Sequence, residues 1–326
     1  MAKNRIQEIL GIKYPIVQAS MTWITNAEFV AAVSEAGGMG VLGPNAGQTT
    51  LTTDPIETAE RMRKEIIKTR RLTDKPFAVQ YIVPMPAFPS TYTFSGPILN
   101  VLEEEEVKYV LASGYIITEE IKKLKDKGFT VIFRDLDPTI EAAKAAEEVG
   151  VDVLIATGYN EGGAMPSRRI GTLTIVPMIV DAVKTPVLAA GGIVDNRRMK
   201  AVIDLGAQGA YIGTLFVVSK ECPASEICKQ DIVNSESKDL VEFFGIPTFW
   251  RATPHKLALE LAKMTESGST REDVAARMND LIALKAGMLD GDLENGINSV
   301  SDAVSDIKSI RTCKEIINDL VRGMEF

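Results

Sequence analysis

Eight short apolar runs, separated by longer segments with helical periodicity, constrain the fold of this 326-residue chain more than any other feature. The runs are PIVQASM from Pro15, GMGVLG from Gly38, FAVQYIV from Phe77, YVLASG from Tyr109, TVIFRD from Thr130, VDVLIATG from Val151, PVLAAGGI from Pro186 and GAYIGTLFV from Gly209. They are rich in β-branched residues and apolar at successive positions, which is typical of parallel strands covered on both faces. The alternation therefore predicts repeated βα units.

Helices are expected between these runs, over residues 26–36, 118–126, 138–149 and 196–205. Asp137-Pro138 and Asp195 provide start signals, and Gly128 follows a lysine-rich last turn. Eight βα units within about 220 residues match the (β/α)8 barrel, whose usual size is about 250 residues. The predicted fold class is therefore α/β, a (β/α)8 TIM barrel, with an open doubly wound sheet as the alternative.

Beyond Val218 the β-rich runs stop and polar, helix-like sequence follows. This change predicts a barrel core at residues 1–221 and a C-terminal helical extension at residues 222–326, which completes the barrel and covers its mouth. The amphipathic stretches HKLALELAKM and RTCKEIINDLVRGM are expected to pack on the core. A homodimer surface or a lid is the alternative role for this segment.

The composition excludes several classes of function. One histidine, His255, is too few for zinc sites built on histidine pairs, so no metal site is expected. A net charge of −8 without a basic stripe argues against a nucleic-acid partner. Three cysteines without a CxxC pair indicate a reducing compartment, and no run approaches about 18 apolar residues, so a cytoplasmic protein without a membrane span is expected.

Ligand-binding groups of a barrel lie at the carboxyl ends of its strands. The last two runs end in Ala190-Gly191-Gly192 and in Gly213-Thr214, where glycine N–H groups and a hydroxyl suit a phosphate. Small groups at Ala19, Ser20 and Met21 and the amide of Gln80 suit a planar ring. These residues together predict a phosphate at one side of the barrel mouth and a ring beside it.

The sixth run continues into a loop longer than a structural turn requires. It contains Thr157, Gly158, Tyr159, Glu161, Gly162, Gly163 and Ala164, followed by Arg168 and Arg169. The glycines and Thr157 are cofactor-binding candidates. Tyr159 and Glu161 are candidate proton donors, with cation binding or capping of the loop as the alternatives for Glu161. Either arginine is a candidate for a dinucleotide phosphate or for plain surface solvation.

Several blocks of sequence resemble the FMN-dependent family that contains nitronate monooxygenases (2-nitropropane dioxygenases) and flavin-type enoyl-acyl-carrier-protein reductases. The similar blocks are YPIVQASM, AAVSEAGGMGVLG, the GYNEGG loop, PVLAAGGIVDNRRMKAVIDLGAQGAYIGTLFVVSKEC and GDLENG. The resemblance implies a TIM barrel that holds one non-covalent FMN. It places the phosphate on Gly191, Gly192, Gly213 and Thr214, and the ring between residues 19–21 and Gln80.

Three positions depart from the family pattern. Ala164 stands where relatives have their proton-transfer histidine, Ser20 stands where they have proline, and their late GQ-type loop here reads Asn298 to Asp302. An alanine cannot exchange a proton, so substrate deprotonation at that position is not expected. His255, about ninety residues later, is expected at a helix start rather than in the site.

The hypothesis is an FMN-dependent oxidoreductase, similar to nitronate monooxygenases, that oxidises a small-molecule nitronate or NAD(P)H through the flavin. One alternative is an enoyl (activated alkene) reductase that uses NADH or NADPH. Another is a flavin-binding redox sensor or partner subunit without turnover. A nucleotide dehydrogenase with a cysteine nucleophile is disfavoured, because no cysteine lies in the loop after the sixth run.

Overall fold

The computed structural model describes residues 4–86, 88–246 and 248–326. Its main sheet has eight parallel strands in the order β1-β9-β8-β6-β5-β4-β3-β2. The strands are β1 (Ile16–Gln18), β2 (Gly40–Leu42), β3 (Phe77–Ile82), β4 (Tyr109–Gly114), β5 (Thr130–Asp135), β6 (Val153–Thr157), β8 (Val187–Ala190) and β9 (Gly209–Ile212). Each strand lies within one of the eight apolar runs, so the prediction of eight parallel strands is confirmed.

The sheet curls until its first two strands meet. A parallel bridge joins Val17 to Met39, and the N–H of Gln18 donates to the carbonyl of Met39 at 2.9 Å. The fold is therefore a nearly closed TIM-like barrel rather than an open doubly wound sheet. Side chains from the strands fill its interior, and Ile6 and Leu10 of α1 (Arg5–Leu10) close the end opposite the mouth.

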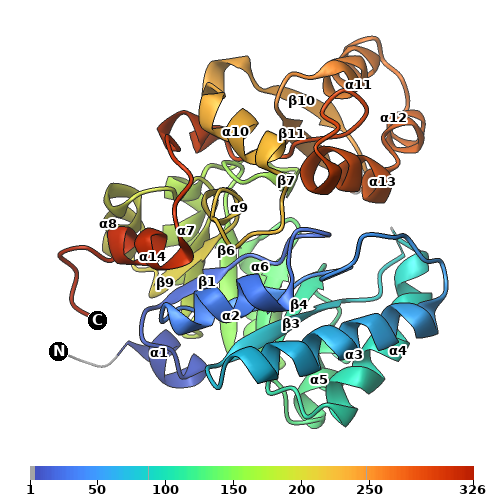
Figure 1. Cartoon of the computed structure of the whole chain (residues 1–326). Helices are drawn as coiled ribbons and strands as arrows, with labels where there is room; N and C mark the ends of the chain where they lie inside the picture. The colour runs from blue at the N-terminus through green and yellow to red at the C-terminus, as the bar shows by residue number, and fades with distance from the viewer. Residues whose placement is uncertain (1–3, 87, 247) are drawn as a thin grey trace.

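Helices surround the barrel (Figure 1). They are α2 (Ala27–Glu35), α3 (Pro55–Leu72), α4 (Ser90–Glu104), α5 (Thr118–Asp126), α6 (Ile140–Glu148), α7 (Thr172–Val180), α8 (Asn196–Asp204), α9 (Thr214–Val217) and α14 (Cys313–Leu320). The four helices predicted between strands are present to within two residues at either end. Among the described helices, none is both long and apolar enough to cross a membrane.

The cap predicted for α6 is wrong. Thr139, not Asp137, is its N-cap and accepts a hydrogen bond from the N–H of Ala142 at 3.0 Å. The Asp137 carboxylate instead accepts from the hydroxyl of Ser167 and from the N–H of Arg168. The N-cap predicted at Asp195 is confirmed.

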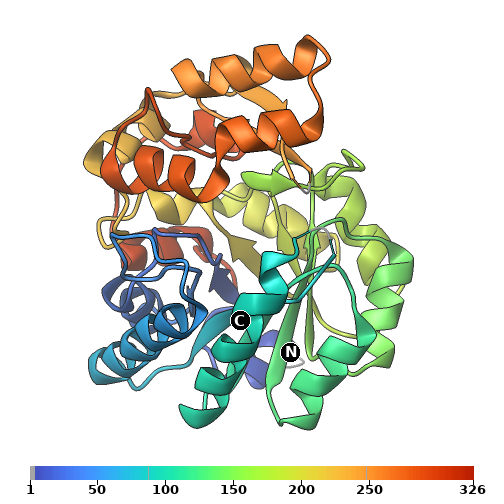
Figure 2. The same cartoon turned by 90° about the vertical axis from the view of Figure 1, so that its right-hand side faces the viewer.

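Residues 222–310 form a lobe above the mouth of the barrel (Figures 1 and 2). Its elements are α10 (Glu226–Asn234), η1 (Ser237–Asp239), β10 (Val241–Phe244), β11 (Phe249–Ala252), α11 (Lys256–Glu266), α12 (Arg271–Met278), α13 (Asp280–Leu284), the π-helical turn η2 (Lys285–Asp290) and the 3-10 helix η3 (Asp302–Asp306). The chain then returns to the barrel. There Ser219 and Arg311 form an isolated parallel β-bridge, and α14 packs against α2 and α8.

The expectation that this segment lacks strands is wrong. β10 and β11 pair antiparallel, and β11 also pairs with β7 (Gly163–Met165) from the loop after β6. Strands of four residues carry little local sequence signal. Here β11 gains its backbone partners from β10 and from β7, which lies some 80 residues earlier in the chain. The lobe is thus joined to the barrel by a sheet, through the pairing of β11 with β7.

Candidate active site

A cavity of about 480 Å³ lies at the carboxyl ends of the barrel strands, beneath the lobe. Predicted site residues that line it are Ala19, Ser20, Met21, Gln80, Glu161, Gly162, Gly163, Ala164, Ala190, Gly191, Gly192, Gly213 and Thr214. The lobe contributes Ile246, Trp250, Leu281, Leu284, Met288, Ser299 and Ser301. The volume suits a cofactor-sized ligand, since such pockets typically enclose about 300–1,000 Å³.

One wall of the cavity follows β1. The N–H of Ala19 donates to the carbonyl of Ile212, and the N–H of Ser20 donates to the hydroxyl of Tyr211 at 3.0 Å. The Ser20 and Tyr211 hydroxyls are also 3.0 Å apart. Proline has no N–H, so a proline at position 20 could not make the hydrogen bond from this backbone to Tyr211. These contacts hold residues 19–21 against β9.

A second wall is the glycine cradle, which consists of Gly191, Gly192, Gly213 and Thr214. Gly191 and Gly192 have φ of +103° and +71°, a region that side chains rarely adopt. A Cβ on Gly191 would also lie 2.7 Å from Thr172 Oγ1. Within the described ranges, the N–H groups of Gly191, Gly192 and Gly213 donate no hydrogen bond to the protein. The cradle therefore presents free donors to the cavity.

The turn that begins η3 closes the cradle from the lobe side. The N–H of Ser301 donates to Thr214 Oγ1 at 3.0 Å, so the Thr214 hydroxyl proton is left to point elsewhere. Asp302 lies beside Gly192: its Oδ1 is 3.6 Å from the point where a Cβ of that glycine would stand. The late loop, residues 298–302, thus touches both halves of the cradle.

The loop after β6 forms the third wall. In the β7–β11 pair, Ala164 stands opposite Trp250, and both line the cavity. Gly162 has no room for a side chain, because its Cβ would lie 2.6 Å from the carbonyl carbon of Val300. Arg251 of β11 donates to the carbonyls of Tyr159 and Glu161 at 3.2 and 2.9 Å. The lobe therefore determines the shape of this loop.

A buried ion pair lies at the mouth of the barrel. Arg134 at the end of β5 donates to both carboxylate oxygens of Glu161 at 2.8 Å. Burial raises the pKa of Glu161, and the charge of Arg134 opposes that rise. Burial also raises the pKa of Tyr211, which Arg134 again opposes. Among the described residues lining the cavity, only Arg134, Glu161 and Tyr211 carry groups that ionise.

Three predicted site residues do not reach the cavity wall. Thr157 is buried in β6, and Gly158 packs against Thr172. The Tyr159 hydroxyl donates to Glu242 at 2.6 Å, and its ring lies under the Arg251 guanidinium. Glu242 and Arg251 belong to the lobe strands β10 and β11, so the Tyr159 side chain points toward the lobe sheet and not into the cavity. We expect Tyr159 to connect the loop to the lobe rather than to transfer protons.

The arginines of the loop have protein partners. Arg168 lies 3.5 Å from Asp137, while Arg169 lies 3.7 Å from Glu242 and 4.3 Å from the Phe249 ring centroid. Both side chains are more than half exposed. Neither lines the cavity, which favours the surface interpretation.

His255 is the N-cap residue of α11, as expected, and its Nε2 lies 2.8 Å from Asp231. It does not line the cavity. Cys222, Cys228 and Cys313 are buried and likewise stand apart from the cavity wall. Burial raises the pKa of the Cys222 thiol to about 12, so this sulfur is not a ready nucleophile. These positions disfavour a cysteine-dependent dehydrogenase.

Four further residues that line the cavity are not among the predicted ones: Arg134, Tyr211, Trp250 and Ser301. Arg134 carries a local signal, since a charge inside the apolar run TVIFRD points to a polar end of the barrel. Tyr211 sits in GAYIG with only apolar and glycine neighbours, so nothing local identifies its partner. Trp250 and Ser301 reach the cavity only because the lobe folds over the barrel.

The family model "Nitronate monooxygenase" matches residues 3–323. Probable nitronate monooxygenases of Staphylococcus haemolyticus and Staphylococcus aureus are 33% identical, covering 73% of this chain and 74% of the relative. The structure of FabK from Thermotoga maritima aligns with a TM-score of 0.85 and 30% identity, covering 99% and 96% of the two chains. A nitroalkane oxidase from Streptomyces ansochromogenes aligns at 0.79 with 22% identity over 97% of each chain.

Proposed function

Since the chain belongs to the nitronate monooxygenase family of flavin oxidoreductases, we propose that it binds FMN and oxidises a nitronate or NAD(P)H through it. The observation that carries the proposal is the glycine cradle, which opens into a cavity large enough for a cofactor and its substrate. The wall at residues 19–21 lies on the same cavity. The cavity thus offers the glycine cradle for the phosphate of FMN and the wall at residues 19–21 for its ring.

The donors present fit a phosphate. The N–H groups of Gly191, Gly192 and Gly213 have no protein partner among the described residues, and the Thr214 hydroxyl can donate as well. Glycine permits the close approach that such contacts require. We assign the phosphate to this cradle and the ring to the space between residues 19–21 and Gln80. When bound, FMN would supply hydride or electron transfer.

The chain's own residues would exclude water and hold charge. Trp250, Leu284 and Met288 cover the cavity with apolar surface from the lobe. Arg134 and Glu161 compensate each other at its base, so the buried charges remain paired. The cavity is therefore apolar on the wall formed by the lobe and polar on the wall formed by the barrel strands.

Ala164 sets the choice of substrate. We propose that it occupies the position of the family's proton-transfer histidine. Its side chain lines the cavity opposite Trp250 and cannot take a proton from a neutral nitroalkane. A nitronate is already an anion and requires no base. The proposed substrate class is therefore a preformed nitronate rather than the neutral nitro compound.

The similarity to FabK over 99% of the chain favours one second candidate, reduction of an activated alkene by NADH or NADPH. That reaction adds a proton to the carbon beside the activating group. Tyr211 is the candidate proton donor on the cavity wall, because Tyr159 lies outside the cavity and Glu161, which also lines it, is paired with Arg134. Both candidates use the same cofactor site.

The first experiment is FMN binding followed by anaerobic reduction. FMN at about one hundred times its Kd should raise the free energy of unfolding by about 2.7 kcal/mol. The yellow protein is then mixed with NADH, with NADPH or with a nitronate, and flavin absorbance is recorded. Bleaching by a nitronate supports the leading proposal. Bleaching by a nicotinamide, with colour returning on addition of a 2-enoyl thioester, supports the second candidate.

Riboflavin, which lacks the phosphate, is the matched control and should stabilise the protein less. A protein that gains no stability from FMN would contradict the proposal at the cofactor. Binding without bleaching by any of the three donors would instead favour a flavin-binding protein that does not turn over.

A further inference from the structure

We propose that Arg134 anchors the substrate: its unused N–H groups bind the planar oxyanion of a nitronate, and Glu161 limits the positive charge that they present. The inference rests on the proposed function and deepens it, because it names the residue that recognises the charge of the substrate. It gives this chain a means of selecting an anion at a site where Ala164 cannot exchange a proton.

The alternation of side chains along β5 directs Arg134 into the cavity. Ile132 packs in the barrel interior, and Arg134 follows on the same side at the end of the strand. Its neighbour on β4 is Ser113, which also lines the cavity. Among the described residues of the cavity wall, Arg134 is the only lysine or arginine. This guanidinium is thus the cation that an anionic substrate meets there.

Among the described contacts of this guanidinium, one nitrogen makes all the hydrogen bonds. Nη2 donates to both carboxylate oxygens of Glu161 at 2.8 Å and lies 3.4 Å from the carbonyl oxygen of Ala164. Nε and Nη1 donate to none of the described residues. Neither nitrogen is fully enclosed, so an acceptor in the cavity can reach both. A desolvated donor without an acceptor is unfavourable, so this edge favours a ligand that supplies oxygen atoms.

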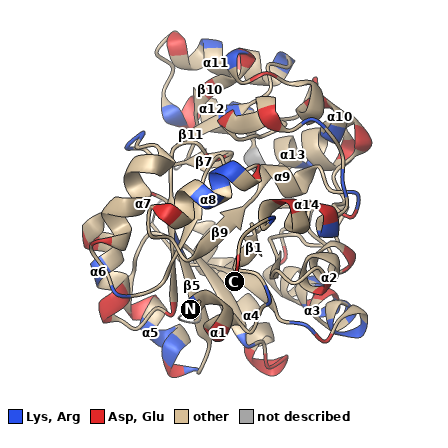
Figure 3. Ribbon diagram, turned by 90° about the vertical axis from the view of Figure 1, so that its left-hand side faces the viewer, with Lys and Arg blue, Asp and Glu red and all other residues tan. Residues whose placement is uncertain are grey.

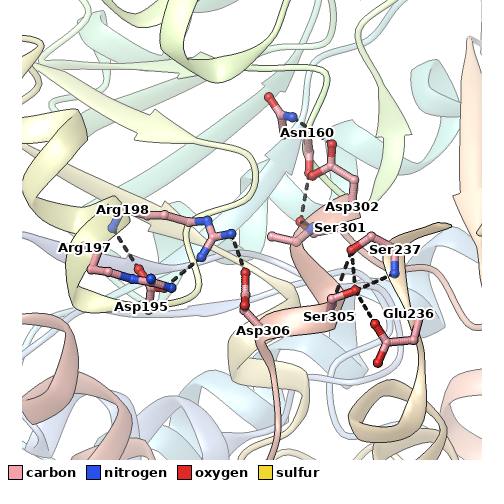
Figure 4. A network of polar contacts seen from close by, with 11 residues as sticks. Asn160, Asp195, Arg197, Arg198, Glu236, Ser237, Ser301, Asp302, Ser305 and Asp306 are labelled. Carbon is pink, nitrogen blue, oxygen red and sulfur yellow. Dashed lines mark hydrogen bonds and ion pairs between the residues drawn. The ribbon is translucent and has the colours of Figure 1, made fainter.

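The lobe holds the Glu161 backbone in place. The carbonyl of Glu161 accepts a hydrogen bond from Arg251 at 2.9 Å. The preceding residue, Asn160, donates to Asp302 at 2.7 Å, and its carbonyl accepts from the hydroxyl of Ser301 at 2.9 Å (Figure 4). These contacts fix the segment from which the Glu161 side chain extends to Arg134. The guanidinium is therefore preorganised, with the same edge left for a ligand.

The ligand that fits this edge is a small planar oxyanion. A guanidinium recognises carboxylate-like groups through N–H donors that lie in one plane, and a nitronate has the same planar pair of oxygens. Since Nη2 lies beside the Ala164 carbonyl, a nitronate on Arg134 is next to the methyl group of Ala164 and not to a base. Its negative charge distinguishes it from the neutral nitro compound. Glu161 offsets part of the attraction, because its carboxylate repels a second anion.

The test measures the binding of propionate, which carries a planar oxyanion, and of propionamide, its uncharged analogue. The proteins are loaded with FMN, whose phosphate is assigned to the glycine cradle, and binding is measured by calorimetry at neutral pH. The variants are Glu161→Gln, the double variant Arg134→Gln with Glu161→Gln, and Arg168→Gln. The double variant avoids a buried Glu161 charge without its partner. Arg168 is an exposed arginine of the same loop that does not line the cavity, so it is the matched control.

Glu161→Gln should bind propionate about tenfold more tightly than the wild type, because the guanidinium keeps its charge and loses the competing carboxylate. The double variant should bind propionate at least about tenfold more weakly, since the charge and its donors are both removed. Propionamide affinity should change far less in either variant, and Arg168→Gln should match the wild type. A general loosening of the site cannot produce opposite shifts from two changes in one pair.

Equal propionate affinity in the wild type and the double variant would overturn the inference, as would weaker propionate binding by Glu161→Gln. Weaker FMN binding by the double variant with unchanged propionate binding would also overturn it, because the unused N–H groups would then serve the flavin. The proposed function fails separately, if a nitronate does not bleach the wild-type flavin although propionate binding follows the expected order. If no FMN binds, the proposed function fails as well, and the same titration of the flavin-free proteins decides the role of Arg134.

Discussion

Burial at the end of β5 changes the pKa of one acid, Asp135. The residue ends β5, next to Arg134, and is 6% exposed. Burial raises its pKa to about 6, more than Arg134 and the N–H of Asp137 lower it. The unfolded chain releases this proton near its ordinary pKa of about 4. Between those values the folded state holds a proton that the unfolded state has lost.

Asp135→Asn should therefore change the pH dependence of stability. In the wild type, this carboxyl costs nothing at about pH 3.5 and costs about 3 kcal/mol of folding free energy at about pH 7.5. The loss develops as the pH rises through about 4 to 6. The variant lacks the loss, so its advantage over the wild type should grow with pH in urea unfolding.

The control for this comparison is Asp74→Asn, in an exposed loop position. It should differ from the wild type by less than about 0.5 kcal/mol at every pH. An Asp135→Asn advantage that is independent of pH would mean that the effect comes from hydrogen bonding and not from titration.

At the scale of elements, the β7–β11–β10 sheet connects the cavity side of the barrel to the lobe. Gly163 and Ala164 of β7 pair with Arg251 and Trp250 of β11. The buried Arg251 side chain adds two hydrogen bonds to the carbonyls of Tyr159 and Glu161. One element thus positions both the loop and its covering tryptophan.

Arg251→Gln should detach the loop from the lobe. The change removes the Arg251 guanidinium from Glu242 and leaves two carbonyls without donors, at a cost of about 3 kcal/mol. Hydrogen exchange at β7 and β11 should accelerate, and FMN affinity should decrease. Arg251→Lys should recover only part of the stability, because an ammonium cannot span the same acceptors.

Arg271→Gln is the matched control, since that guanidinium is exposed and lies 4.9 Å from the Phe244 ring centroid. Its unfolding free energy should be within about 1 kcal/mol of the wild type. Faster exchange in both variants alike would show that the lobe edge is generally labile and that Arg251 has no special part.

At the scale of the whole molecule, the lobe is an excursion between α9 and α14. Ser219 and Arg311, at its two ends, are bridged, and the chain resumes the barrel with α14. Ile316, Ile317 and Leu320 of α14 are fully buried, and the Ile317 Cδ1 lies 3.1 Å from the Cβ position of Gly38. Barrel and lobe residues also belong to one continuous apolar cluster. We therefore expect them to unfold together.

Ile317→Ala should destabilise the whole molecule by about 3 kcal/mol, through lost burial and a residual cavity. Intrinsic fluorescence and circular dichroism should still report one coincident transition, at lower denaturant. Ile282→Ala on α13, where the side chain is 49% exposed, should shift the midpoint little. Separate transitions for the two probes would contradict the single cooperative unit.

The charge distribution is another property of the whole molecule. On the side shown in Figure 3, lysine and arginine alternate with aspartate and glutamate along the outer helices, without a continuous basic stripe. With a net charge of −8, this side offers phosphate backbones no attractive surface. The cavity, by contrast, gathers its few polar groups from many elements.

The sequence by itself determined the barrel and the cradle. Eight runs that are apolar at successive positions require a sheet covered on both faces, whatever the partners. Gly191 and Gly192 carry their own information, because their backbone conformation excludes side chains. His255 at the start of α11 was likewise predictable from its neighbours. Each of these features depends on interactions within a few residues along the chain or on burial alone.

Only the tertiary structure decided which side chains share the cavity. Glu161 reaches Arg134, whereas Tyr159, two residues away, is held by Glu242 of the lobe. Asp302 meets a glycine more than 100 residues earlier, and Trp250 meets Ala164. These contacts join segments with no shared periodicity, so no local pattern encodes them. They exist because the lobe folds back over the strand ends, where its buried polar groups find their partners.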